Sequence, residues 1–468
     1  MTADKIDDQT IGIEIIDMGS EGEGIGKAEG LAVFVPGAIT GDLAEVRITT
    51  QKKNFAKAEL IRIVKPSRYR TEPFCRYAGE CGGCSLQSMS YEGQLLLKQK
   101  MVRDRLERIG GIQDPKVHKV QGMKIPLRYR NKAQFPIQNG QVGFYKAKSH
   151  SLVSVYECGI QAEPAEAIAA ALRKFIASDH LTSYDEKTGK GLLRHLIVKT
   201  GFQSGEVMAV LVCNGEGISN REKLVDQLQK AVDQLPPTKS GLGYKLRSVI
   251  LNVNRKKTSE ILGHECITLY GQPVIKDKVG DLEVEISPLS FYQVNPHQMK
   301  RLYDLVVEYG GFTGQETVVD LYCGVGTIGL YCASKAKRVL GIESEKSAVL
   351  DANRNAVING IVNAEFIHGK SEVELPKLLE EGIQPDVVLL DPPRAGCDPV
   401  LLSAIVEAGP KRIVYVSCDP ATLARDVKLL TEGGYKFVEG QAVDMFPWTM
   451  HVETVVLMRI MKVVELVC

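Results

Sequence analysis

The 468-residue sequence lacks any apolar run that approaches the roughly 18 residues needed to span a bilayer. Its first residues, Met1 to Gln9, are polar and acidic, so we expect no signal peptide. An even cysteine count is also missing. Eleven cysteines without an export signal favour reduced or metal-bound thiols over a disulfide framework. These absences predict a cytoplasmic protein with no membrane partner.

Net charge is small as well, at +1, and does not by itself indicate a partner. The charges are unevenly distributed, however. Residues 44–76 carry nine Lys and Arg against three acids, and residues 98–132 carry eleven against three. A solvated helix face would explain one such run. Two basic stretches on a nearly neutral chain instead favour a nucleic acid bound on one face.

The N-terminal segment, residues 1–66, contains frequent turn residues, so any strands between them must be short. Its short apolar runs alternate in the manner of strands, as in Ile11, Ile13 and Ile15, and they end at Gly and Pro. Five such strands predict a small β-barrel, a fold that often binds oligonucleotides.

Three cysteines, Cys75, Cys81 and Cys84, lie within ten residues, and Cys158 is the candidate for a fourth thiol. Zinc and an iron–sulfur cluster both accept four thiolates. Zinc sites usually pair two CxxC motifs, and only one is present here. The spacing therefore favours a closed 4Fe–4S cluster, with free buried cysteines as the alternative.

Residues 317–329 read as a strand, a glycine loop and a helix. Gly324, Gly326 and Gly329 match GxGxxG, and Glu343 follows about 20 residues later, where an acid grips ribose hydroxyls. NAD is therefore one candidate cofactor. Asp320, on the strand before the loop, is instead typical of S-adenosylmethionine sites.

Two further strands end in reactive side chains. The run 387–390 leads into Asp391, within an Asp-Pro-Pro motif that is typical of methyltransferases acting on bases, and the run 413–417 leads into Cys418. Ligands of open α/β sheets bind at the carboxyl ends of the strands. A dehydrogenase gives no role to Cys418, so this pair favours methyl transfer.

These motifs together resemble the RNA uracil C5-methyltransferases, in particular the branch with an iron–sulfur cluster that modifies 23S ribosomal RNA. The resemblance covers nearly the whole chain. The motifs that carry it are the barrel, which resembles a TRAM domain, Cys75/Cys81/Cys84/Cys158, residues 291–295, residues 320–327, residues 391–394, residues 417–420 and residues 451–455.

The resemblance implies an α/β fold of three parts. A TRAM/OB-like RNA-binding barrel would span 1–66. An iron–sulfur-binding segment and a small α/β central domain would span 67–290, with the basic amphipathic helix at 91–110 packed on the catalytic domain. A Rossmann-like class I methyltransferase domain would span 291–468.

The resemblance also implies roles for single residues. S-adenosylmethionine would contact Gln293, Tyr322, Glu343 and Asp391, while the adenine-side contact near 366–370 stays unassigned. Uracil C5 is a weak nucleophile until a thiolate adds at C6, and this is the step expected of Cys418. Glu453 would then remove the C5 proton.

The partner implied by the resemblance is RNA, with 23S ribosomal RNA favoured and transfer RNA as the alternative substrate. Two rival functions remain at this stage. One is an amino-directed methyltransferase that needs no covalent intermediate, and the other is an RNA-binding protein that has lost the reaction. Oligomeric state is not indicated by the sequence.

Overall fold

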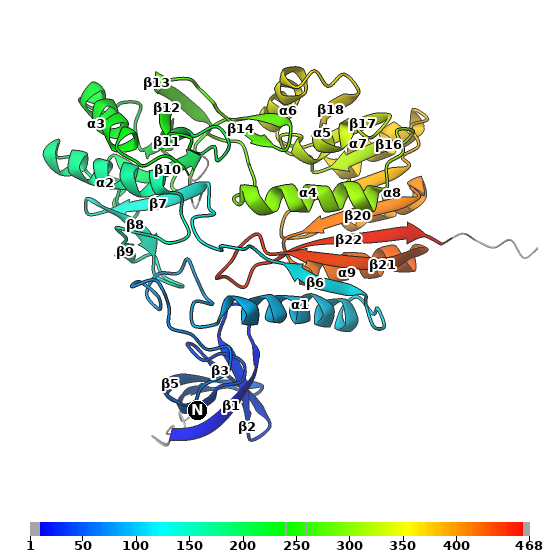
Figure 1. Cartoon of the computed structure of the whole chain (residues 1–468), viewed down its shortest axis with the longest axis horizontal. Coiled ribbons are helices and arrows are strands. Elements are labelled where there is room, and N and C mark those ends of the chain that lie inside the picture. The colour runs from blue at the N-terminus through cyan, green and yellow to red at the C-terminus, as the bar shows by residue number, and fades with distance from the viewer. Residues whose placement is uncertain (1–9, 239–240, 259, 462–468) are drawn as a thin grey trace, which may run out of the picture. The chain divides into compact units, whose positions relative to one another are not determined.

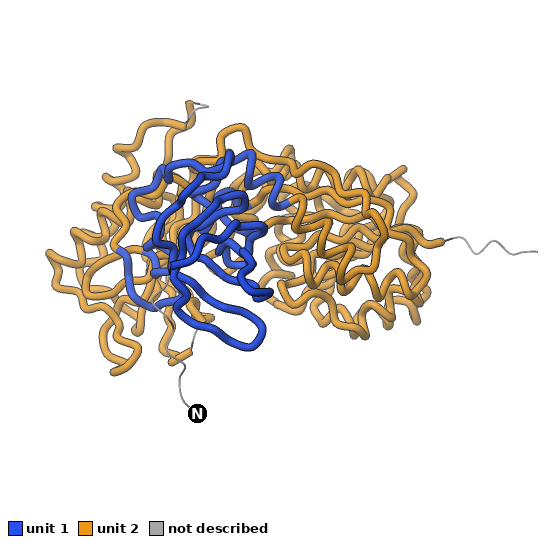
Figure 2. Tube along the Cα trace, turned by 90° about the horizontal axis from the view of Figure 1, so that it is seen from below, with its two compact units in different colours: residues 1–98, 144–153, 446–451 blue, residues 99–143, 154–445, 452–468 orange. Residues whose placement is uncertain are grey.

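The computed structural model describes residues 10–238, 241–258 and 260–461 (Figure 1). The chain divides into two compact units, which Figure 2 shows in separate colours. Unit 1 comprises residues 1–98, 144–153 and 446–451, and unit 2 comprises residues 99–143, 154–445 and 452–468. Within the described ranges, no helix is both long enough and apolar enough to cross a bilayer.

Unit 1 contains a closed five-stranded barrel with strand order β1-β2-β3-β5-β4. The strands are β1 (Thr10–Met18), β2 (Gly24–Ala28), β3 (Leu31–Val35), β4 (Leu43–Gln51) and β5 (Phe55–Lys65). Alternate residues of the strands face inward, so Ile13, Ile15, Val33 and Val46 form the barrel core. The barrel that the turn and strand pattern predicted is confirmed.

Unit 2 is built around an eight-stranded sheet with the order β18-β17-β16-β19-β20-β22-β21-β6. Its strands are β18 (Ala364–His368), β17 (Arg338–Glu343), β16 (Thr317–Leu321), β19 (Val387–Leu390), β20 (Arg412–Ser417), β22 (Glu453–Ile460), β21 (Tyr435–Val443) and β6 (Val117–Gln121). The helices that accompany it are α1 (Tyr91–Arg108), α4 (Pro296–Gly310), α5 (Thr327–Ala333), α6 (Lys346–Ile358), α7 (Ser371–Glu380), α8 (Pro399–Ala408) and α9 (Pro420–Glu432). Helix α1 begins in unit 1 and ends in unit 2, where Gln99 Nε2 donates a hydrogen bond to the carbonyl of Val117 in β6.

Strand order in this sheet reverses between β16 and β19. From β18 to β20 all neighbours are parallel, and the chain runs outward from β16 in one direction and from β19 in the other. Such a reversal leaves a crevice at the carboxyl ends of the two central strands. Beyond β20, strand β22 is antiparallel, so its first residue lies at the same edge of the sheet. The Rossmann-like α/β class is confirmed.

A second sheet of seven strands has the order β13-β12-β11-β10-β7-β8-β9. Its strands are β13 (Glu265–Gly271), β12 (Lys245–Val253), β11 (Glu206–Cys213), β10 (Leu193–Thr200), β7 (Lys132–Gln138), β8 (Gln141–Tyr145) and β9 (Leu152–Ser154). Helices α2 (Glu163–Ser178) and α3 (Arg221–Asp233) accompany it, and β14 (Ile275–Val279) with β15 (Leu282–Ile286) forms a separate two-stranded ribbon. Strands β10 to β12 are almost wholly buried, which explains their continuous runs of apolar residues.

Candidate active site

The loop after β16 has the backbone shape of a ligand cradle. Tyr322, Gly324 and Gly326 have positive φ angles of 63°, 55° and 79°, a conformation that glycine adopts easily. Gly326 is also required for space, because an added Cβ would lie 2.7 Å from Cζ of Phe366. A Cβ at Gly324 would meet nothing within 4 Å. The loop is therefore closely packed at Gly326 and open at Gly324, where a ligand can approach the backbone.

Two carboxylates hold this loop. Asp320 Oδ2 accepts a hydrogen bond from the amide of Gly329 at 2.9 Å, and Glu343 Oε2, at the end of β17, accepts one from the amide of Gly324 at 3.0 Å. Burial, with the nearby charges of Asp391 and Glu343, raises the pKa of Asp320 to about 8. Its Oδ1 is buried and has no hydrogen-bond partner among the described residues. Asp320 Oδ1 could therefore accept a hydrogen bond from a ligand beside the glycine loop, since buried polar atoms without a partner often mark functional sites.

A cavity of about 390 Å³ opens beside the loop, at the carboxyl ends of β16, β17 and β18. It is lined by Tyr322, Ser344, Lys370 and Asp398, among other residues. This volume lies within the range of small-molecule sites. The cavity therefore brings the predicted contact Tyr322 next to Ser344, the residue after Glu343, and to Lys370, in the segment that the sequence left unassigned.

Cys418 is half-buried in a tight turn between β20 and α9. Asp419 caps the helix, because its Oδ1 accepts hydrogen bonds from the amides of Ala421 and Thr422 at 2.8 and 3.1 Å. Ser417 Oγ donates to the carbonyl of Asp419 at 3.0 Å. The thiol is therefore held by strand, cap and helix at the carboxyl edge of the sheet.

Glu453 lies beside Cys418 as a consequence of strand pairing. Ser417 of β20 pairs with Thr454 of the antiparallel β22, so Cys418 and Glu453 occupy the next opposed positions. Opposed residues of an antiparallel pair have Cβ atoms about 5 Å apart. The Glu453 side chain is almost wholly buried, and its Oε2 has no hydrogen-bond partner among the described residues.

The ionisable groups at this edge perturb one another. Burial, followed by the negative charges of Glu453 and Asp391, raises the pKa of Cys418 to about 11, while Arg394 opposes the rise. Burial and Asp391 raise the pKa of Glu453 to about 8, again against Arg394. The pKa of Asp391 is raised to about 7 by burial. The structure thus brings the predicted nucleophile, base and carboxylate together, and adds Arg394, a residue of the motif to which the sequence assigned no role.

Gln293 lies on the segment before α4. Its backbone is held by a residue next to β7 of the seven-stranded sheet. Asn131 Nδ2 donates to the carbonyl of Gln293 at 2.9 Å. The buried Lys199 Nζ donates to the carbonyls of Ser287 and Ser290 at 2.7 and 2.9 Å, just ahead of this segment. Sequence analysis missed Lys199, which stands in an apolar strand without any motif.

The predicted cluster ligands Cys75, Cys81, Cys84 and Cys158 are all of intermediate burial. Cys75 is close enough to Cys81 to contribute, after burial, to raising the pKa of the Cys81 thiol. Among the residues that the structure describes, however, no group of three or more His, Cys, Asp or Glu side chains is arranged to hold a metal ion. The four-thiolate site therefore stays a prediction from the cysteine spacing.

A parallel sheet with a glycine loop, an acid at the end of the next strand and a cavity between them defines an α/β domain that binds a nucleotide-like cofactor. Comparisons with known proteins identify the family. The tRNA (Uracil-5-)-methyltransferase family model matches residues 245–461, and the TRAM domain model matches residues 8–61.

Similar proteins match along almost their whole length. An uncharacterized RNA methyltransferase from Caldanaerobacter subterraneus subsp. tengcongensis is 48% identical, covering 96% of this chain and 97% of that protein. One from Bacillus cereus is 44% identical, covering 94% and 95%. The crystal structure of Pyrococcus abyssi tRNA (uracil-54, C5)-methyltransferase in complex with S-adenosyl-L-homocysteine matches with a TM-score of 0.75 and 28% identity, covering 96% of this chain and all of that one.

The chain therefore belongs to the RNA uracil-5-methyltransferase family with a TRAM domain. It is an S-adenosylmethionine-dependent RNA methyltransferase, which excludes the NAD-dependent alternative. The residues at the sheet edge fit this cofactor. Gly324 leaves open space, Asp320 Oδ1 is buried with no hydrogen-bond partner in the part of the chain that the structure describes, and the adjoining cavity has a suitable volume.

Proposed function

We propose that this protein methylates C5 of a uridine in 23S ribosomal RNA by covalent catalysis, with Cys418 as the nucleophile and Glu453 as the base. The observation that carries the proposal is the position of Cys418 and Glu453 next to Ser417 and Thr454, the last pair between β20 and β22, where the charge of Glu453 acts on the thiol. A thiol that adds to C6 and a carboxylate that removes the proton from C5 must reach neighbouring atoms of one ring. Residues opposed at one sheet edge have Cβ atoms about 5 Å apart, close enough for their side chains to do so.

The residues divide the reaction between them. Cys418 loses its proton to solvent and adds as a thiolate to C6, which places negative charge on the ring and makes C5 nucleophilic. The positive charge of Arg394 favours the thiolate. S-adenosylmethionine supplies the methyl group that C5 takes up. Glu453 then accepts the C5 proton, the ring electrons reform the C5–C6 double bond, and Cys418 leaves as a thiolate.

Gln293, Tyr322, Glu343 and Asp391 are proposed to hold the cofactor. Tyr322 is supported by its place in the wall of the 390 Å³ cavity. Glu343 is supported by its position at the end of β17, where a carboxylate suits ribose hydroxyls. Asp391 stands where the strand order reverses, between the glycine loop and Cys418, and is proposed to orient the methyl donor or the base.

Trapping with 5-fluorouridine tests the covalent step. Fluorine at C5 cannot be removed as a proton, so the wild-type enzyme with S-adenosylmethionine should form a protein–RNA adduct that survives denaturation. Cys418→Ala should form none and should lose methyl transfer. An amino-directed mechanism predicts the opposite result, with an active Cys418→Ala variant and no adduct.

We assign RNA binding to residues 1–66, the central domain to 67–290 and methyl transfer to 291–468, and we place the reaction in the cytoplasm.

Mapping the methylated uridine tests which RNA is the substrate. Deletion of the gene should remove 5-methyluridine from one or more positions of 23S ribosomal RNA. Transfer RNA is the second candidate, because the matched Pyrococcus abyssi enzyme is named for a transfer RNA uridine. Loss of 5-methyluridine from transfer RNA alone would favour that candidate.

An iron–sulfur cluster on Cys75, Cys81, Cys84 and Cys158 is proposed as a separate feature with a supporting role only. The cysteine spacing and the closeness of Cys75 to Cys81 support it. Protein purified without oxygen should contain iron and acid-labile sulfide, and each of the four Cys→Ser changes should reduce both. The exposed Cys266 provides the control, because Cys266→Ser should change neither. Iron-free wild-type protein purified under these conditions would exclude the cluster.

A further inference from the structure

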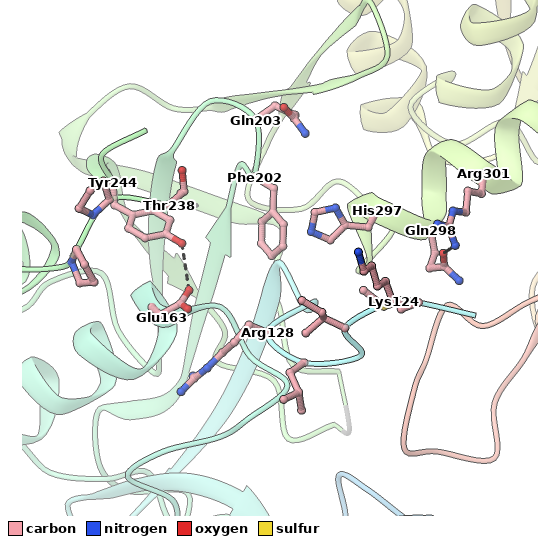
Figure 3. Close-up of a pocket in the computed structure, with 15 residues that line it drawn as sticks. Lys124, Arg128, Glu163, Phe202, Gln203, Thr238, Tyr244, His297, Gln298 and Arg301 are labelled. Carbon is pink, nitrogen blue, oxygen red and sulfur yellow. Dashed lines mark hydrogen bonds between the residues drawn. The ribbon is translucent and has the colours of Figure 1, made fainter. Parts of the chain in front are cut away.

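A second pocket, of about 550 Å³, lies in unit 2 where the first turn of α4 meets the seven-stranded sheet (Figure 3). It shares no lining residue with the cavity beside the glycine loop. Its volume is sufficient for a nucleotide-sized ligand. Neither the methyl donor nor the residues proposed for catalysis account for this pocket.

Aromatic side chains form part of its wall. The ring of Phe202 contacts the ring of His297 edge to face, with centroids 5.7 Å apart and planes at 66°. Figure 3 shows Phe202 between His297 and Tyr244, whose hydroxyl donates to Glu163 Oε2 at 3.1 Å. The turn that carries Phe202 is fixed, because the amide of Gln203 donates to the buried Asp277 Oδ1 at 2.7 Å. A fixed aromatic ring in an open pocket is a suitable surface for stacking an unpaired base.

The charged side chains of the pocket are mainly positive. Lys124, Arg128 and Arg301 line it, whereas Glu163 is the sole carboxylate among the described lining residues. Arg301 Nη1 donates to the carbonyl of Gly122 at 2.6 Å and to Gln298 Oε1 at 2.9 Å. These bonds fix the guanidinium, which has five N–H donors in all and can therefore also bind a phosphate.

The pocket adjoins the proposed reaction site along the chain. His297 follows Gln293 by four residues, so their Cα atoms are at most about 14 Å apart. On the other side, the segment from Lys124 to Arg128 leads directly to Asn131, which holds the carbonyl of Gln293. A polymer bound at the cofactor would therefore pass close to this pocket.

We infer that the pocket binds a nucleotide of the RNA that flanks the methylated uridine, with its base stacked on Phe202 and its phosphate held by Lys124 and Arg301. The inference rests on the proposed function and extends it from the target uridine to a neighbouring nucleotide. RNA is favoured over an acidic peptide because the pocket combines ring faces with positive charge. A small-molecule effector would not require the pocket to lie beside the segment that carries Gln293.

Binding measurements with two variants test the inference. Phe202→Leu removes the ring but keeps an apolar side chain, and Lys124→Gln removes one charge at an exposed position. With an unmodified ribosomal or transfer RNA transcript that the wild-type enzyme methylates, each variant should raise the Kd for RNA. We expect about 5- to 150-fold for Phe202→Leu, the effect of losing one stacked base. Lys124→Gln should reduce the slope of log Kd against log salt by about one. The Kd for S-adenosylmethionine should stay unchanged in both.

Lys300→Gln is the matched control, because Lys300 lies on α4 beside Arg301 but pairs with Asp304 and does not line the pocket. It should bind RNA like the wild type. Photocrosslinking with 4-thiouridine or 8-azidoadenosine next to the target should label the segment around Phe202 or Tyr244.

Wild-type RNA affinity in both Phe202→Leu and Lys124→Gln would overturn the inference, as would equal losses in Lys300→Gln. Saturable binding of an acidic peptide that RNA does not displace would overturn it too. Failure of the proposed function would be a different result, since the wild type would then form no 5-methyluridine. RNA anisotropy with a labelled oligouridylate would still test the pocket in that case.

Discussion

Cys418 and Glu453 stand opposite each other, one step beyond the paired residues Ser417 and Thr454, at the end of β20 and the start of β22. The negative charge of Glu453 contributes to raising the pKa of the Cys418 thiol. A carboxylate so close to the proposed nucleophile makes thiolate formation harder in the free enzyme. Its presence is therefore better explained by the last step of the reaction than by the first.

Glu453→Gln should stop the reaction after the covalent step. The amide cannot accept the C5 proton, so methylated RNA should stay attached to Cys418. Turnover should fall by about 10²- to 10⁴-fold, the usual contribution of a general base. Release of tritium from RNA labelled at uridine C5 and a denaturing gel for the adduct measure the two effects. Glu432→Gln, an exposed carboxylate at the end of α9, should behave like the wild type. Normal tritium release by Glu453→Gln would assign the base to another residue.

Arg394→Gln should raise the pKa of Cys418 further above its value of about 11, because the guanidinium is the positive charge that favours the thiolate. The rate of alkylation by iodoacetamide, measured against pH, should shift to higher pH, and methyl transfer at neutral pH should fall about tenfold or more. Lys428→Gln, an exposed change on α9, should leave the profile unchanged. A shift of the Arg394→Gln profile to lower pH would contradict the assigned role.

The parts of the site that could be predicted from sequence are the reactive residues that directly follow a strand. Asp391 and Cys418 each follow a short apolar run, and such runs in an α/β chain end at one edge of the sheet. The facing of Cys418 and Glu453 could not be predicted in this way. It depends on β22 entering the sheet antiparallel to β20, a pairing between segments more than 30 residues apart.

The contact between Lys199 and the segment that leads to Gln293 could not be predicted from the sequence either. Lys199 follows a run of apolar residues in β10, and nothing near it in sequence indicates that its Nζ reaches the carbonyls of Ser287 and Ser290. The cysteine segment shows the reverse case. Its spacing is distinctive, yet the described side chains do not form a metal site.

Asp320→Asn should remove a pH-dependent loss of stability. The pKa of Asp320 is about 8 in the folded protein and near 3.8 when unfolded, so its contribution to stability is present below about pH 4 and is lost as pH rises through 8. The melting temperature of the cofactor-free wild type should therefore fall more between pH 5 and pH 9 than that of Asp320→Asn. The difference should correspond to more than about 1 kcal/mol.

The amide of Asn should still accept the bond from Gly329, so the fold should persist in this variant. Asp281→Asn, an exposed change in the turn between β14 and β15, is the matched control and should follow the wild-type curve. Parallel melting curves for the wild type and Asp320→Asn across this pH range would show that Asp320 is charged in the folded state at low pH as well.

Lys199→Met should weaken cofactor binding without touching the cofactor. The buried amino group of Lys199 holds two carbonyls at the start of the segment that leads to Gln293, and methionine would remove the donor of both bonds. An unsatisfied buried acceptor costs about 1–3 kcal/mol, so the variant should melt earlier, and its Kd for S-adenosylmethionine should rise about tenfold. Lys187→Met, an exposed change in the same sheet region, should alter neither value. If Lys199→Met lost stability but bound S-adenosylmethionine like the wild type, Lys199 would support the fold alone. A rise in the Kd for the cofactor, measured by calorimetry at a temperature where both proteins are folded, would instead make it a positioning residue.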